Sequence, residues 1–246
     1  MKIIAIANHK GGVGKTATAH ALGAILAENG QRVLLVDLDP QGSLTAAAGV
    51  NASGASLAEV LSGDITTKKA IHAITDNLAI LASDIALANV ELGLISRLNR
   101  ENQLKKALGG LDYDYCLIDC PPSLSILTVN ALTAANGVLI PTQPQIADLR
   151  GLSLFMDSLA SIRQELNPEL STLGILVTFF DTRLNHHAAA VEAMEGSGLP
   201  VLHTKIGRSV RVAEAMGAGE SVVTFEPDNK QAQAYRELGK ELFNHG

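Results

Sequence analysis

Residues 10–16 read Lys-Gly-Gly-Val-Gly-Lys-Thr and follow a short apolar run at residues 3–7. An Ala- and Leu-rich stretch, residues 16–29, comes next and ends at Gly30, a residue that commonly ends a helix. A glycine-rich loop between a strand and a helix lets successive backbone N–H groups surround phosphate oxygens, and the helix N-terminus adds partial positive charge. The segment therefore predicts a phosphate-binding loop.

Within this loop, Lys15 is expected to neutralise the charge of the β- and γ-phosphates, and the hydroxyl of Thr16 to bind Mg²⁺. The usual spacing, G-x-x-x-x-G-K-[ST], would place glycine at position 9, where this chain has His9. An extra lysine begins the loop instead. The predicted nucleotide-binding residues are Lys10, Gly11, Gly12, Val13, Gly14, Lys15, Thr16 and Ala17.

Short aliphatic runs alternate with helical patterns along the whole chain, which predicts a mostly parallel, doubly wound α/β sheet with helices on both faces. No Gly/Ser-rich, Pro-rich or charged linker divides the 246 residues, so a single domain over residues 1–246 is expected. The seven expected strands lie at residues 3–7, 33–36, 78–81, 115–118, 138–140, 173–177 and 201–202.

Composition excludes several classes of protein. Apolar residues make up 47% of the chain, enough for a sizeable core and too many for a disordered chain. Cys116 and Cys120 are expected to be buried thiols in a reducing cytosol, and no apolar stretch reaches the ~20 residues that span a bilayer. The net charge of −6 disfavours nucleic acid as a partner unless basic residues cluster locally.

Three acidic residues follow predicted strands. Asp37 and Asp39 come at the end of residues 33–36, and Asp119 ends residues 115–118. Because ligands of open α/β sheets bind beyond the carboxyl ends of the strands, all three are candidates for the nucleotide site. An aspartate that ends an apolar strand matches a Walker B element, which holds Mg²⁺ through water, so Asp119 is a predicted metal ligand. A solvated acid at a strand end is the plain alternative for Asp119.

Lys-Gly-Gly-Val-Gly-Lys-Thr followed by Val-Asp-Leu-Asp-Pro-Gln at residues 36–41 resembles the deviant-Walker ATPases of the ParA/Soj/MinD group. The resemblance implies ATP and Mg²⁺ as cofactors and a homodimer in the ATP state. It implies that Lys10 reaches the phosphates of the partner subunit's ATP, that Asp39 positions the attacking water, and that Asp37 lies near Mg²⁺. The expected catalytic residues are Lys10, Lys15 and Asp39.

Two further segments resemble the family less completely. Pro-Thr-Gln-Pro at residues 141–144 matches its P-x-Q element, but Gln145 and Arg150 stand where the family often has glutamates. By the same resemblance, Pro227 and Asp228 are expected near the base and ribose.

Residues 178–183 and 207–215 resemble ParA and Soj in particular, with a T-x-x-D-x-R turn and a V-R-x-x-E-A helix start. In such proteins the arginine that Arg211 matches belongs to a basic surface, completed by dimerisation, that binds DNA without sequence preference. Residues 196–213 carry three cations and no acid, although an ordinary solvated helix end would look the same. The candidate DNA-binding residues are Arg183, Lys205, Arg208, Arg211 and Arg236.

The expected function is therefore a slow, partner-stimulated ATPase that acts in plasmid or chromosome partitioning, in the cytoplasm on the nucleoid. The expected partners are non-specific DNA and a ParB-like protein with a basic N-terminal segment. The alternative is a MinD-like or cargo-positioning ATPase that docks on a membrane or protein scaffold. Residues 238–246 lack a basic amphipathic pattern, which disfavours the membrane. The chain begins at its first strand, so no N-terminal helix-turn-helix is expected.

Overall fold

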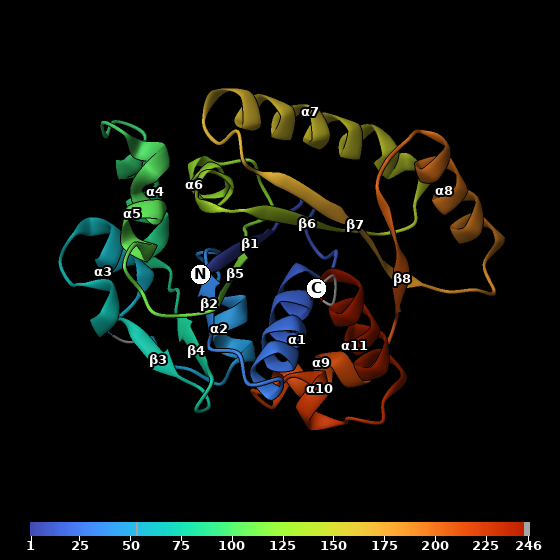
Figure 1. The fold of residues 1–246 in the computed structure, drawn as a ribbon, viewed down its shortest axis with the longest axis horizontal. Coiled ribbons are helices and arrows are strands. Elements are labelled where there is room, and N and C mark those ends of the chain that lie inside the picture. The colour runs from blue at the N-terminus through green and yellow to red at the C-terminus, as the bar shows by residue number, and fades with distance from the viewer. Residues whose placement is uncertain (53, 244–246) are drawn as a thin grey trace.

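One eight-stranded sheet runs through the computed structural model, which describes residues 1–52 and 54–243. Its strands lie in the order β3-β4-β2-β5-β1-β6-β7-β8 (Figure 1), and only β3 runs antiparallel to its neighbour. The strands are β1 (Lys2–Ile6), β2 (Val33–Asp37), β3 (Ile71–Ala73), β4 (Leu78–Leu81), β5 (Tyr115–Asp119), β6 (Gly137–Thr142), β7 (Ser171–Phe180) and β8 (Val201–Gly207).

Helices cover both faces of this sheet, and each face has its own hydrophobic core. One face packs against α3 (Leu57–Ser62), α4 (Ala86–Leu94), α5 (Gln103–Leu108), α6 (Ile126–Ala134), α7 (Leu149–Glu165) and α8 (Asn185–Gly196). The other packs against α1 (Lys15–Glu28), α2 (Ser43–Ala47), α9 (Val210–Gly217), α10 (Val222–Phe225) and α11 (Lys230–Phe243). Short 3₁₀ turns are η1 (Thr67–Lys69), η2 (Arg100–Asn102) and η3 (Ile146–Asp148).

The aliphatic runs form strands because a sheet covered on both faces buries every side chain of its central strands. All five residues of β2 are buried, for example. The doubly wound, mostly parallel α/β fold is confirmed, and each of the seven expected strands is present. The sequence missed β3, because three residues at a sheet edge carry too little periodicity to predict a strand.

Two strands are longer than their aliphatic runs indicated. β7 extends through Phe180, so residues 178–180 are strand rather than the expected turn. β8 extends to Gly207 and contains Lys205. In both cases pairing between β7 and β8 continues past the aliphatic run.

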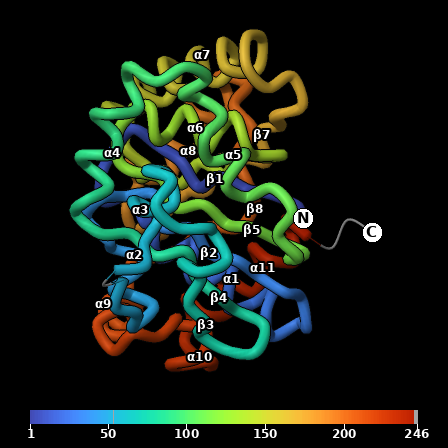
Figure 2. Tube along the Cα trace, turned by 90° about the vertical axis from the view of Figure 1, so that its left-hand side faces the viewer, coloured from blue at the N-terminus to red at the C-terminus, as the bar shows by residue number. Residues whose placement is uncertain are grey.

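The loops after β1, β2 and β5 meet at one edge of the sheet, because these strands are adjacent and parallel. Asp37 and Asp119 are paired in register at the ends of β2 and β5. Figure 2, with the N-terminus on the right, shows α2, α4 and α9 on the opposite, left-hand side, beyond the carboxyl ends of these strands. This edge positions the site.

Candidate active site

The glycine-rich loop joins β1 to α1 as the sequence predicted. Gly12 and Gly14 have φ angles of 69° and 84°, a region that side chains with a Cβ rarely adopt. These two turns wrap the backbone around the start of α1, and Gly14 is the residue that caps that helix. Gly11 and Gly12 are exposed and Val13 is buried, so the loop is anchored by one side chain and presents its backbone outward.

Lys15 begins α1 and is buried, with 7% of the residue exposed. Its Nζ donates a hydrogen bond to the carbonyl oxygen of Lys10 at 3.1 Å, so the side chain folds back over the loop. Burial lowers the pKa of Lys15, and the nearby Asp119 opposes that shift. An anion in the loop would oppose it further, because a negative charge favours the protonated amine.

Asp119 is a buried carboxylate of the site that lacks well-formed hydrogen bonds within the described chain. It is 1% exposed, and neither carboxylate oxygen makes a well-formed hydrogen bond to another described residue. Burial raises the pKa of Asp119 to about 8, and the neighbouring carboxylate of Asp37 adds to the shift. Such a bare carboxylate beside the Thr16 hydroxyl fits a divalent cation that brings its own charge and water ligands.

Asp37 has the opposite character, because both of its oxygens are engaged. Oδ2 accepts hydrogen bonds from the backbone N–H of Thr45 at 2.7 Å and from the Thr45 hydroxyl at 2.8 Å. Oδ1 accepts the N–H of Asp39 at 3.2 Å. Asp37 lies beside Asp119, and its contacts hold α2 and the loop that carries Asp39.

A cavity of about 410 Å³ opens beside the glycine-rich loop, and Asp39 lines it. One end is made by loop residues 11–17, and the other by apolar side chains of β8 and α9, which include Ile206, Val212 and Met216. The arrangement suits a ligand with charged phosphates at one end and a flat apolar ring system at the other.

Sequence reasoning missed Phe179, which lines this cavity next to Thr178. Adjacent residues of a regular strand point to opposite faces, so both can face the cavity only where the strand is irregular. The pairing of β7 with β8 shifts register here, and Phe179 has a φ of 53°. The position of Phe179 in the cavity depends on this irregular backbone geometry, which the sequence alone does not indicate.

Lys10 does not line the cavity of its own chain. Its Nζ lies 2.6 Å from Oδ2 of Asp148 and donates to Oε1 of Gln145 at 3.0 Å. Gln145 in turn donates to Gln143, which donates to the carbonyl oxygen of Gly12. The loop after β6 thus holds Lys10 away from the nucleotide cavity. The sequence did not identify Asp148.

Pro227 and Asp228 are the residues that the resemblance places near the base and ribose. Pro227 and Asp228 are exposed in the loop between α10 and α11, and neither lines the cavity. The apolar end of the cavity is built by α9 and Phe179 instead. A contact of Pro227 and Asp228 with the base and ribose stays a prediction.

The candidate DNA-binding residues do not form one free basic surface. Arg183 pairs with Asp181 at 2.7 Å, and Arg236 pairs with Glu28 at 2.6 Å, beside the end of α1 that lies away from the glycine-rich loop. Arg211 contacts both Glu214 and Glu226. The acids come from outside residues 196–213, so the sequence segment did not reveal them.

Lys205 and Arg208 are the members of this set without an ion pair in the part of the chain that the structure describes. Lys205 lies over the ring of Phe180 at 5.9 Å, and Arg208 lies over the ring of Phe179 at 5.8 Å. Lys205 lies in β8 and Arg208 directly follows it, so both lie near the apolar end of the nucleotide cavity.

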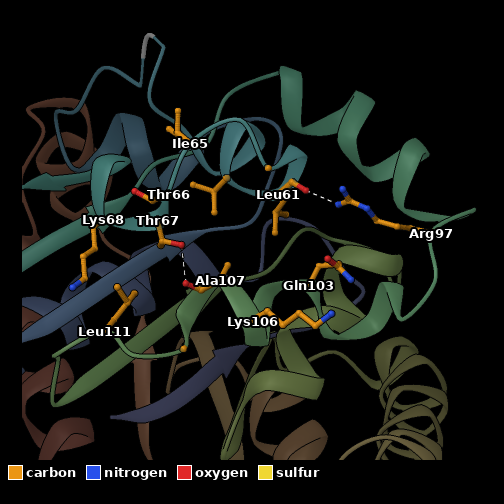
Figure 3. A pocket seen from close by; sticks show the side chains of 13 residues that line it. Leu61, Ile65, Thr66, Thr67, Lys68, Arg97, Gln103, Lys106, Ala107 and Leu111 are labelled. Carbon is orange, nitrogen blue, oxygen red and sulfur yellow. Dashed lines mark hydrogen bonds between the residues drawn. The ribbon is translucent and has the colours of Figure 1, made fainter.

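A second hollow of about 470 Å³ lies between α3, η1 and α5 (Figure 3). Its walls are joined by hydrogen bonds from Arg97 to the carbonyl oxygen of Leu61 and from Thr67 to that of Ala107, each 2.7 Å long. It shares no residue with the cavity beside the glycine-rich loop. None of the expected catalytic residues lies in it, so it is not the active site.

Comparison with known proteins agrees with this geometry. A family model described as "AAA domain" matches residues 1–172. The chain is 40% identical to the sporulation initiation inhibitor protein Soj of Bacillus subtilis (strain 168), over 100% of this chain and 99% of Soj. It is 40% identical to the chromosome partitioning protein ParA of Myxococcus xanthus (strain DK1622), over 98% of this chain and 87% of that protein. The chain belongs to the ParA/Soj family of P-loop ATPases.

A solved structure similar to this ParA/Soj family member is a cobyrinic acid a,c-diamide synthase from Mycobacterium smegmatis with bound ADP and magnesium. The two share 39% identity and superpose with a TM-score of 0.86, over 100% of this chain and 95% of that one. The similarity therefore extends over the whole fold and includes the glycine-rich loop.

Proposed function

We propose that this protein is an ATP-driven switch of DNA partitioning, which binds Mg·ATP, dimerises and then binds DNA without sequence preference. The observation that carries the proposal is the bare, buried carboxylate of Asp119 beside Thr16, next to a loop with two lysines. A related structure that contains ADP and magnesium supports the same cofactors here.

The residues of the cavity have distinct roles in this proposal. Loop residues 11–17 hold the phosphates, Lys15 neutralises their charge, and Thr16 and Asp119 hold Mg²⁺. Mg²⁺ supplies charge stabilisation of the phosphates when it is bound. Asp39 lines the cavity and orients the attacking water, and the products are ADP and phosphate.

A second copy of the chain completes the site. Lys10 lies outside its own cavity on Asp148 and Gln145, and these contacts must break before it reaches the partner subunit's phosphates. Leu124, Ile146 and Val210 are exposed aliphatic residues that follow the carboxyl ends of β5, β6 and β8. Exposed apolar residues at the edge of the sheet that carries the nucleotide site favour a face that another protein covers.

DNA binding is the step that dimerisation controls. Lys205 and Arg208 are cations without acidic partners among the described residues, and one such pair binds phosphates weakly. Two pairs in one dimer bind the backbone together, and binding is lost when hydrolysis separates the subunits. A ParB-like protein with a basic N-terminal segment is the proposed stimulator of that hydrolysis.

The test is binding to non-specific duplex DNA, by fluorescence anisotropy, with ATP, ADP or no nucleotide and at two salt concentrations. We expect binding only with ATP, and weaker binding at the higher salt. Arg208→Glu should abolish binding, whereas Arg163→Glu on α7, a matched exposed cation outside the set, should leave it unchanged.

Absence of DNA binding in every nucleotide state would favour the alternative, an ATPase that docks on a protein scaffold or a membrane. Among the described helices, none is long and apolar enough to cross a bilayer. The end of the C-terminal segment considered above, residues 244–246, lies outside the described residues.

A further inference from the structure

The outer surface of α4 carries large aliphatic side chains that no part of the described chain covers. Ile85, Leu92 and Ile95 are 71%, 68% and 55% exposed. The opposite side of the same helix is buried in the core through Leu87 and Leu94, at 0% and 1%. The helix is therefore apolar on both sides, whereas a surface helix of a monomer normally has a polar outer face.

The outer residues have the spacing of a helix–helix seam. With Ala88 they recur at i, i+3, i+7 and i+10, the a and d positions of a heptad repeat. The backbone of Ile85 and of Ile95 is also helical, so the helical turn spans the whole stripe. We define the α4 stripe as Ile85, Ala88, Leu92 and Ile95.

The stripe begins at the edge of the sheet that carries the nucleotide site. The loop before α4 is tied to α2 by a hydrogen bond from the N–H of Ser83 to the Thr45 hydroxyl at 2.9 Å. Ile85 also borders a hollow shared with Pro40 and Gln41, directly after Asp39. In Figure 2, α4 lies on the same side of the molecule as α2 and α9.

We propose that the α4 stripe packs against a second copy of this chain when two ATP-loaded subunits close, which rests on the dimer of the proposed function. A two-fold dimer buries the same patch of both subunits. An apolar stripe continuous with the proposed interface is therefore buried on each of the two subunits. The stripe carries no charge, which fits a dry helix seam and does not fit a nucleic acid. It widens the dimer interface beyond the residues that touch nucleotide.

The experiment measures the dimer dissociation constant by sedimentation velocity with a non-hydrolysable ATP analogue. Leu92→Ser with Ile95→Ser should raise that constant at least about tenfold, because two exposed aliphatic side chains per subunit no longer gain burial. The affinity for the analogue should not change, since neither residue lines the cavity. Calorimetry measures it at protein concentrations low enough to keep the chain monomeric. Both positions are exposed, so the fold should be retained, which circular dichroism checks.

Leu98→Ser is the matched control, because Leu98 is 91% exposed but lies beyond the helical stripe. It should dimerise like the unaltered chain. Equal weakening by the control, or unweakened dimerisation of the double variant, overturns the α4 proposal and leaves the proposed function intact. If the unaltered chain stays monomeric with the analogue, the dimer of the proposed function fails, and the α4 proposal fails with it.

Discussion

His20 lies in α1, where it is 3% exposed, and its Nδ1 has no hydrogen-bond partner among the described residues. Burial lowers the pKa of His20 to about 4, below the ordinary value of about 6.5. The unfolded chain therefore binds this proton first, and the free energy of unfolding falls as the pH drops from about 6.5 towards 4. Between pH 7 and pH 5 this residue should cost about 2 kcal/mol of stability.

Urea unfolding at the two pH values tests this effect. The unaltered chain loses stability through all its titrating groups, whereas His20→Gln should lose about 2 kcal/mol less over the same interval. Equal losses in the two proteins would show that His20 does not remain neutral in the fold.

Asp148 holds Lys10 through an ion pair in which both side chains are partly exposed. Such a pair is worth about 1 kcal/mol. Because Lys10 of each subunit must leave Asp148 to reach the partner subunit, two such pairs break per dimer, and Asp148→Asn should strengthen ATP-dependent dimerisation about thirtyfold. Sedimentation velocity measures the change, with Asp157→Asn on the exposed side of α7 as control. Weaker dimerisation of Asp148→Asn would mean that the aspartate instead positions Lys10 for the partner.

The turns that follow α2 and α9 approach each other backbone to backbone. Gly49 and Gly219 have φ angles of 67° and 78°, and a Cβ at Gly219 would lie 3.0 Å from the Cα of Gly49. Since Asp37 holds the start of α2, this approach links the loop of Asp39 to the helix that carries Arg211. A side chain at this point must move one of the two elements.

Gly219→Ala should therefore lower the free energy of unfolding by more than the cost of placing alanine at a positive φ. Gly110 is the matched comparison, because its φ of 73° is similar but a Cβ there would meet nothing within 4 Å. Gly110→Ala should cost about 1 kcal/mol, and Gly219→Ala should cost at least about 1 kcal/mol more. Urea unfolding at pH 7 measures both. Equal costs would mean that α2 and α9 adjust freely at this contact.

The assembly as a whole can be tested by mixing subunits. Lys10→Gln should bind ATP without dimerising, and Asp39→Ala should dimerise without hydrolysing ATP. In a mixed dimer, the subunit with intact Asp39 receives Lys10 from its partner, so one of the two sites is complete. Phosphate release should therefore reappear when the two inactive variants are mixed. A mixture as inactive as its components would contradict the action of Lys10 across the interface.

Much of the fold and of the phosphate end of the site could be predicted from the chain. Aliphatic runs in alternation with helical patterns predicted a parallel sheet because buried central strands need apolar residues on both faces. The glycine-rich loop predicted its own conformation, since Gly12 and Gly14 adopt φ angles that other residues disfavour. Asp119 could be proposed as a site residue because it ends an apolar strand.

The sequence alone determined the elements whose signal is local: the strands, the loop around Lys15, and the acids that end β2 and β5. Only the tertiary structure decided what these groups touch. In it, Lys10 pairs with Asp148 and Arg211 pairs with Glu226. Phe179 and α9 line the apolar end of the cavity, and the large side chains of the α4 stripe are exposed. The physical reason is that such contacts join residues far apart in the chain, and their partners depend on how strands bend and helices pack.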